Sequence, residues 1–223
     1  SGPPKLAGSF YRQLIDGVLA ELEAWDHRAV LRASHDLLDP SMLADINRLD
    51  RVGVLLMGEY SPELPQFISQ CLRPLVLMDL IHDSWADVVT TDNVVGIGAA
   101  FDYLYQLGHR KIGFVGKLDS IVAFVERFNT FKWKMAEVGL PVRPEWIYEG
   151  LNHIDVTAEG VKHILSLPDR PTAFLCANDC SALGVVRAAD ALRILVPTQL
   201  SVIGFDDEDF AAVVTPALTT GRV

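Results

Sequence analysis

Short apolar runs alternate with longer amphipathic stretches along this chain. Leu200–Phe205 is an apolar run of strand type that ends abruptly in the four acidic residues 206–209. Ser9–Trp25 instead repeats its apolar residues at the period of a helix. The same patterns predict strands over 29–33, 52–57, 75–78, 88–91, 111–115, 146–148, 172–176, 200–205 and 217–220, and helices over 9–25, 41–49, 62–71, 94–107, 121–138, 157–167 and 181–195.

This alternation of strands and helices predicts an α/β fold. A continuous apolar run is typical of a parallel strand buried on both faces, and the short spacing leaves room only for direct crossovers. We therefore expect parallel sheets with helices on both faces. The chain opens in a loop before its first helix and stops at Arg222-Val223, just after a strand-type segment. We expect the fold to be truncated at both ends.

Composition and charge exclude several classes of protein. The chain is 50% hydrophobic and 22% charged, which is typical of a globular protein, and no apolar run approaches the ~20 residues of a membrane span. Its first four residues lack the basic and apolar regions of a signal peptide. A net charge of −10 opposes contact with a nucleic-acid backbone. The cysteines have no metal-binding spacing and indicate reduced thiols of a cytoplasmic protein.

Polar residues directly follow several predicted strands. Asp79, Asp92, Asn178 and Asp206 each stand at the end of an apolar run. Ligands of open α/β sheets bind outside the carboxyl ends of the strands, so these residues together predict a cleft for a polar small molecule. Taken singly, each is better explained as the N-cap of a following helix.

No motif in the chain indicates catalysis. Gly96-Ile97-Gly98 superficially suggests a dinucleotide-binding loop, but it lacks the third glycine spacing and Asp92-Asn93 separates it from the strand. Small residues that pack a helix on a sheet explain it better. No phosphate-binding loop, nucleophile elbow or zinc-protease motif occurs, and the histidines are scattered singly. We expect no enzyme activity, no cofactor and no metal site.

Several longer blocks of sequence stand in a specific order. They are Val89–Asn93, Leu107–Gly116, Pro171–Asp179, and Val196–Asp207 followed by Thr215–Thr220. With these blocks the chain resembles the effector-binding domain of the LacI/GalR family of bacterial transcription regulators over nearly its whole length. The Leu-Gly-His-Arg and Gly-Phe-Asp-Asp sequences separate this family from its periplasmic sugar-binding relatives.

The resemblance implies two Rossmann-like lobes of the periplasmic-binding-protein type I, with an effector cleft between them. We expect the N-terminal lobe over residues 1–116 and the C-terminal lobe over 117–223. The helix-turn-helix domain that binds DNA in this family lies outside the chain, which agrees with the acidic charge.

The resemblance also implies the site residues. Arg127 stands at the family's effector-binding arginine, although Thr130 replaces the glycine of the usual Arg-x-x-Gly-Phe context. Asn178 and Asp179 match the family's Asn-Asp pair, and Asp206 matches its cleft aspartate. Asp207 is expected to cap or brace. A surface ion pair with Glu126 remains the alternative for Arg127.

Further candidates are aromatic or stand at a strand end. Phe10 and Tyr11 match the aromatic pair after the family's first strand, and Trp85 is a third ring that could cover the C–H face of a sugar. Asp92 completes the expected ligand-binding set. Carboxylates, amides and a guanidinium together can bind the hydroxyls of a sugar.

We therefore expect the sensing domain of a repressor-type regulator. A sugar or sugar derivative would bind between the lobes, and a homodimer would transmit the change to operator DNA through the N-terminal domain. The alternatives are a periplasmic sugar-binding protein of a transport system and a sugar-modifying α/β hydrolase.

Overall fold

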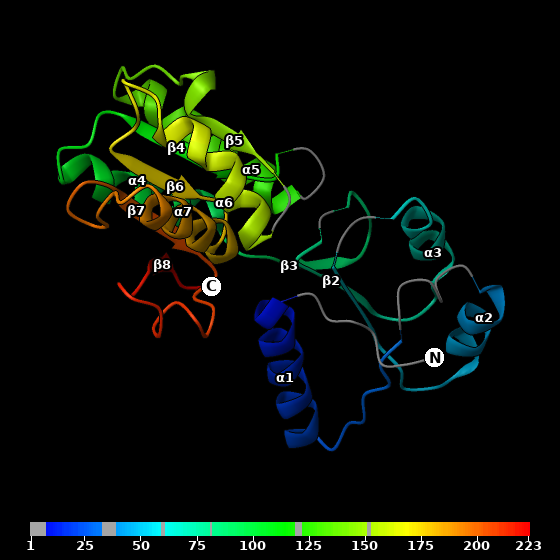
Figure 1. The fold of residues 1–223 in the computed structure, drawn as a ribbon. Helices are drawn as coiled ribbons and strands as arrows, with labels where there is room; N and C mark the ends of the chain where they lie inside the picture. The colour runs from blue at the N-terminus through cyan, green and yellow to red at the C-terminus, as the bar shows by residue number, and fades with distance from the viewer. Residues whose placement is uncertain (1–7, 33–38, 59–60, 81, 119–121, 151–152) are drawn as a thin grey trace. The chain divides into compact units, whose positions relative to one another are not determined.

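Two parallel sheets, each in its own unit, organise the chain (Figure 1). The computed structural model describes residues 8–32, 39–58, 61–80, 82–118, 122–150 and 153–223. Contacts divide the chain into Ser1–Thr90 and Thr91–Val223, called here the first and second units. The predicted α/β fold with parallel sheets is confirmed.

The first unit has a three-stranded sheet in the order β1-β2-β3. Its strands are β1 (Val54–Met57), β2 (Leu75–Met78) and β3 (Asp87–Val89), and its helices are α1 (Gly8–Ala24), α2 (Pro40–Arg48) and α3 (Leu64–Gln70). Helix α2 begins where the Asp39 carboxylate accepts a 2.9 Å hydrogen bond from the Ser41 amide. Two small apolar clusters lie in this unit, one around Leu77 and one around Phe67.

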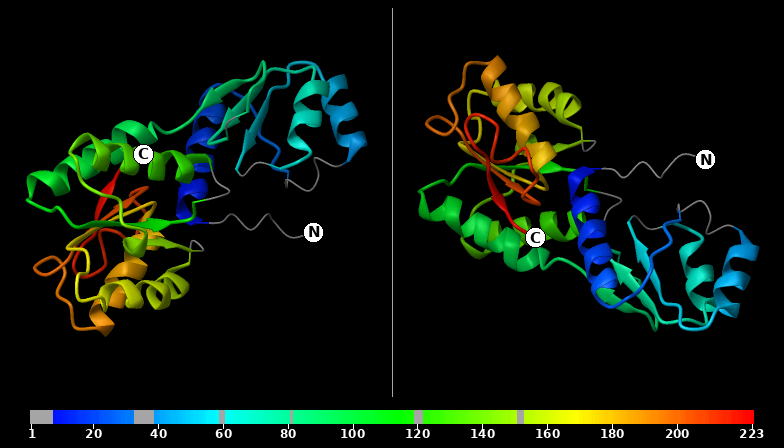
Figure 2. Two further views of the ribbon diagram at one scale, coloured as in Figure 1. Left: turned by 90° about the horizontal axis from the view of Figure 1, so that it is seen from above. Right: turned by 90° about the horizontal axis from the view of Figure 1, so that it is seen from below.

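The second unit has a five-stranded sheet in the order β5-β4-β6-β7-β8. Its strands are β4 (Ile112–Gly116), β5 (Ile147–Glu149), β6 (Ala173–Cys176), β7 (Ser201–Phe205) and β8 (Thr219–Gly221), and its helices are α4 (Asn93–Gln106), α5 (Val122–Glu137), α6 (Ile154–Leu165) and α7 (Asp179–Ala191). Helices α4 and α5 cover one face of this sheet, and α6 and α7 cover the other (Figure 2).

A separate apolar core fills each face of the five-stranded sheet. Phe101, Phe114 and Phe131 are fully buried on the side of α4 and α5, whereas Phe174 is fully buried on the side of α6 and α7. Strands β4 and β6 are buried at every residue. This packing fixes the carboxyl ends of the strands, where the polar residues lie.

The structure differs from the expected division at residue 116. Strand β4 pairs with β5 and β6, so it belongs to the second unit's sheet, and α4 packs on α5 in the same unit. The division falls instead between Thr90 and Thr91, just after β3. A glycine at a strand end carries no information on which sheet that strand joins, because pairing is set by residues far apart in the sequence.

One predicted strand is wrong where the structure describes it. Residues 29–32 are not in a strand, and Val30 and Leu31 are exposed; residue 33 lies outside the described ranges. An apolar pattern alone does not make a segment a strand, because a strand also needs a neighbouring strand as partner for its backbone hydrogen bonds. Within the described helices, none has both the length and the apolar character needed to cross a bilayer.

Candidate functional site

The acidic turn after β7 has an unusual backbone. Asp206 has a φ of 107° and Asp207 a φ of 54°, both in the left-handed region that non-glycine residues rarely occupy. The Asp206 amide donates to the Gly221 carbonyl at 2.9 Å, and the Arg222 Nε donates to Asp207 Oδ2 at 2.7 Å. Strained backbone of this kind persists where surrounding bonds over-determine it, which is common in ligand sites. The predicted bracing role of Asp207 fits this contact.

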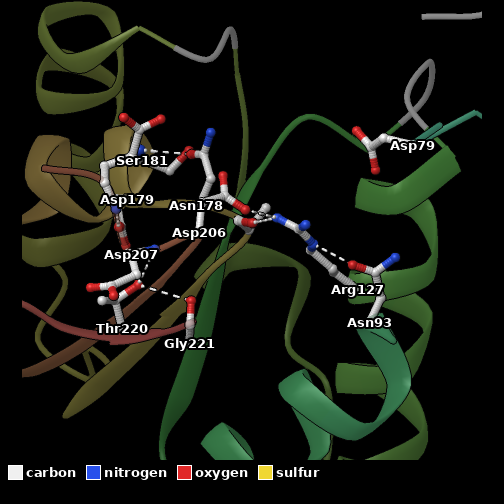
Figure 3. Close-up of polar contacts among 12 residues, drawn as sticks. Asp79, Asn93, Arg127, Asn178, Asp179, Ser181, Asp206, Asp207, Thr220 and Gly221 are labelled. Carbon is white, nitrogen blue, oxygen red and sulfur yellow. Dashed lines mark hydrogen bonds and ion pairs between the residues drawn. The ribbon is translucent and has the colours of Figure 1, made fainter. Parts of the chain in front are cut away.

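Arg127 reaches the same turn from α5 (Figure 3). Its side chain is 3% exposed, and its Nη1 donates to Asp206 Oδ1 at 3.0 Å and to the Ala177 carbonyl at 2.6 Å. Its Nε donates to Asn93 Oδ1 at 2.7 Å. The alternative of a surface ion pair with Glu126 is wrong, because Arg127 is buried and pairs with Asp206 instead.

The Arg127–Asp206 pair keeps unused hydrogen-bonding capacity. Within the described ranges, no residue accepts a hydrogen bond from Arg127 Nη2 and none donates to Asp206 Oδ2. The guanidinium also lies over the Phe205 ring, with 4.1 Å between its central carbon and the ring centroid. The pair therefore offers two N–H donors and a carboxylate oxygen, held in place by other groups.

Burial changes the protonation of Asp206. The loss of water around this carboxyl raises its pKa to about 7, although the nearby Arg127 charge acts in the opposite direction. The negative charges of Asp179 and Glu208 raise the pKa further. This side chain can thus donate as well as accept near neutral pH.

Asp179, the first residue of α7, braces the turn from inside. It is fully buried, and its carboxylate accepts from the Glu208 amide at 2.8 Å and from the Thr220 hydroxyl at 2.6 Å. Burial raises its pKa to about 6. A Cβ at Gly204 would lie 2.1 Å from Asp179 Oδ1, so only glycine leaves room for this carboxylate in β7.

Two predicted ligand residues act as helix caps. Asn178 is buried and its side-chain oxygen accepts from the Ser181 amide at 2.9 Å, at the start of α7. Asp92 is exposed and accepts from the Val95 amide at 2.9 Å, at the start of α4. Asn178 follows Ala177, whose carbonyl accepts a hydrogen bond from Arg127 Nη1. Asn178 therefore lies close to the Arg127–Asp206 pair. Capping alone accounts for Asp92.

The remaining candidates lie in the first unit. Phe10 and Tyr11 are half-buried in α1 with their rings edge to face, and the Tyr11 hydroxyl donates to Asp79 Oδ2 at 3.1 Å. Trp85 is 56% exposed, and its indole nitrogen donates to the Ile68 carbonyl at 3.3 Å. The structure thus joins Tyr11 to a strand-end carboxylate of its own unit, whereas Trp85 is held by α3.

Sequence reasoning missed some residues of the site. Asn93 and Phe205 both contact Arg127, although only their membership of family sequence blocks drew attention to them. Glu208 is a glutamate, a residue type that is usually exposed, but it is buried and no helix follows it. Its amide bond to Asp179 explains the difference, because that bond draws the turn into the protein.

Comparison with known proteins shows which proteins this chain resembles. A family profile described as "Periplasmic binding protein-like domain" matches residues 101–223. Proteins named "HTH-type transcriptional repressor PurR" from Pectobacterium carotovorum subsp. carotovorum (strain PC1) and Serratia proteamaculans (strain 568) are each 33% identical over 220 residues. These alignments cover 95% of this chain and 64% of each relative, so the chain spans less than two thirds of those proteins.

Solved structures show the same fold. A regulatory protein of the LacI family from Chloroflexus aggregans has a TM-score of 0.87 at 25% identity, covering 100% of this chain and 81% of that one. A LacI family transcriptional regulator from Lactobacillus casei with bound glucose has a TM-score of 0.80 at 22% identity, covering 97% and 83%.

Parallel sheets in two units, with polar groups gathered at the carboxyl ends of strands, define a ligand-binding protein of the periplasmic-binding-protein type. The chain belongs to the periplasmic binding protein-like domain family, and it is similar to transcriptional regulators of the LacI family. Its relatives are transcriptional regulators and not enzymes.

Proposed function

We propose that the chain senses an uncharged, sugar-like effector, and that the Arg127–Asp206 pair is the centre of its binding site. The observation that carries this proposal is the buried ion pair with unused donors on Arg127 Nη2 and an unused oxygen on Asp206. Adjacent hydroxyls of a sugar donate to such an oxygen and accept from such a nitrogen. Asn178 stands beside the pair and adds an amide.

The bonding of Arg127 favours an uncharged effector over a phosphorylated one. A guanidinium binds phosphate best through two parallel N–H donors. Each of the two paired N–H edges of Arg127 already has one nitrogen in use. Nε is bonded to Asn93, and Nη1 is bonded to Asp206 and to the Ala177 carbonyl. The buried carboxylates Asp179 and Glu208 add negative charge close by, which opposes an anion.

The names of related proteins support the wider role. The relatives named as repressors favour a transcriptional regulator over a transport-associated binding protein of the same fold. Neighbouring structures whose titles record bound glucose and bound ribose support a sugar as the effector class. We propose that operator DNA is bound by a helix-turn-helix domain of a longer protein, that this protein acts as a homodimer in the cytoplasm, and that the effector alters its affinity for DNA.

Thermal unfolding with matched ligands tests the proposed site. Uncharged pentoses and hexoses and the corresponding sugar phosphates are added to the chain, to Asp206→Asn and to Asp207→Asn. We expect at least one uncharged sugar to stabilise the chain by about 2.7 kcal/mol at a hundredfold excess over its dissociation constant. Asp206→Asn should lose this stabilisation, whereas Asp207→Asn should keep it.

Asp207 is a matched control because it lies in the same left-handed turn but pairs outward with Arg222. Asparagine tolerates the left-handed region, so neither substitution adds backbone strain. The proposal is wrong if no sugar stabilises the chain, if a phosphorylated sugar binds more tightly than its uncharged counterpart, or if both variants respond equally.

A further inference from the structure

The connector between the two units ends beside the effector-site arginine. The chain leaves the first unit's sheet at Val89, the end of β3, and enters the second unit at Asn93, the first residue of α4. Only residues 90–92 lie between these elements. Asn93 is 1% exposed, which is unusual for an amide side chain at a helix start.

The Asn93 side chain is fully engaged with the site. Its Oδ1 accepts from Arg127 Nε at 2.7 Å, and its Nδ2 donates to Glu126 Oε2 at 2.8 Å. Its backbone amide donates to the Thr91 carbonyl at 2.9 Å. One residue therefore joins the connector, by its backbone, to the arginine that pairs with Asp206 (Figure 3).

Packing provides a second and independent link. A Cβ at Gly96 would lie 2.6 Å from the Phe205 ring, so the first turn of α4 packs directly on that ring. The same ring lies under the Arg127 guanidinium. The start of α4 thus contacts the site through a polar bond and through an aromatic ring, and a shift of Arg127 must be accommodated there.

We propose that Asn93 is a positioning residue that couples Arg127 to the connector between the units. An effector that moves or reorients Arg127 then acts on residues 90–92 through this amide. The inference rests on the proposed role of Arg127 in effector binding. It goes beyond that role because it names the residue through which effector binding at Arg127 affects the connector, residues 90–92.

A double-mutant cycle in the full chain tests the coupling without an effector, so its failure is distinct from failure of the proposed ligand. Arg127→Lys keeps the charge beside Asp206 but removes the Nε donor to Asn93. Amide hydrogen exchange is followed at Asn93, Val95 and Gly96, whose amides are hydrogen-bonded at the connector and the first turn of α4. We expect Arg127→Lys to speed this exchange by about 2- to 10-fold, the range expected for one lost hydrogen bond.

In the Asn93→Ala background, Arg127→Lys should produce no further increase, because the link is already broken. A rescue variant that combines Asn93→Asp with Glu126→Gln restores an acceptor for Arg127 and a donor for the new carboxylate. It should recover the wild-type response, which a purely structural role for Asn93 does not predict. Arg187→Lys is the control, because Arg187 pairs with the exposed Asp155 on another face of the unit.

Exchange that does not change in a folded Arg127→Lys variant, or effects of the two substitutions that simply add, would overturn the proposal. If Arg127→Lys does not fold, the reverse measurement decides. Asn93→Ala should then speed exchange of the Arg127 Nε proton, whereas Asn47→Ala, a bonded asparagine of the first unit, should leave it unchanged. Equal exchange in these two variants would also overturn it.

Discussion

The two units bury their sheets to different degrees. Strands β4 and β6 of the second unit are buried at every residue, whereas all three residues of β3 in the first unit are exposed and β1 is only partly buried. The polar groups differ in the same way. Arg127 and Asp206 are almost completely buried in a braced turn, while the Tyr11–Asp79 contact is only partly buried.

This difference bears on the proposed binding site. A site whose groups are fixed by packing and by further hydrogen bonds loses little freedom when a ligand binds. The proposed site around Arg127 and Asp206 in the second unit is of this kind, because both side chains are buried and held by further hydrogen bonds. In the first unit, the partly buried Tyr11–Asp79 contact lies beside a sheet that is itself less buried.

The largest expected effect comes from removing a core ring. Phe131→Ala should cost about 4–5 kcal/mol and Phe67→Ala about 3 kcal/mol, because the smaller clusters of the first unit can relax more around a cavity. Phe131 is fully buried against Phe114 at a centroid distance of 5.2 Å, whereas Phe67 lies in a small cluster with Leu43 and Cys71. Urea unfolding followed in each unit measures both values; equal costs would contradict the comparison.

Among the substitutions, a methyl group at the buried brace should have the next largest effect. Gly204→Ala places a Cβ 2.1 Å from Asp179 Oδ1, which cannot move without breaking its bonds to Thr220 and Glu208, so we expect a loss of about 1–3 kcal/mol. Gly98→Ala is the control, because a Cβ there meets nothing within 4 Å, and in a helix it should stabilise by up to about 1 kcal/mol. Thermal unfolding distinguishes the two, and a neutral Gly204→Ala would show that Asp179 is not a fixed brace.

The buried carboxyls of the second unit predict a pH dependence. The folded-state pKa of Asp206 is raised to about 7 and that of Asp179 to about 6, above the ordinary value of 3.8, so the folded state holds more protons between about pH 4 and 7. Their contribution to stability is therefore full below pH 4 and is lost as the pH rises through 7. We expect a fall of about 4 kcal/mol between pH 5 and 8.

Urea unfolding of Asp179→Asn checks this origin. The fall in the free energy of unfolding between pH 5 and 8 should shrink in this variant, because one buried carboxyl is gone and the pKa of Asp206 loses a raising charge. Asp190→Asn, which changes an exposed carboxylate of the same helix, is the control. A stability that rises from pH 5 to 8 in step with these groups would contradict the assignment.

The smallest effect is expected in the first unit. Tyr11→Phe removes the hydroxyl that donates to Asp79 at 3.1 Å in a partly buried position, so we expect a loss of about 1 kcal/mol. Tyr103→Phe, on the exposed face of α4, should change the stability by less than about 0.5 kcal/mol. A cost for Tyr11→Phe above that of Gly204→Ala would show that the first unit's polar contact is the more tightly held.

Local patterns predicted the elements but not their partners. The spacing of apolar residues located β7, α4 and α7 to within a few residues, because it follows from which side chains of a strand or helix are buried. The same patterns predicted a strand at 29–33, and the family resemblance implied a lobe boundary at 116. Both failed because strand pairing is set by distant residues.

The site shows the same limit. Arg127 and Asp206 were identified through family resemblance, and the structure brings them within 3.0 Å. Asn93 and Arg127 are 34 residues apart, and Asp179 and Thr220 are 41 apart, so no local spacing joins them. The caps at Asp92 and Asn178 were open alternatives in the sequence and are seen directly in the structure.

The most direct test of the central claim is a crystal structure of the chain with the uncharged sugar that raises its melting temperature most. We expect sugar hydroxyls within hydrogen-bonding distance of Asp206 Oδ2 and Arg127 Nη2. A stabilising sugar bound elsewhere, with the Arg127–Asp206 pair untouched, would contradict it.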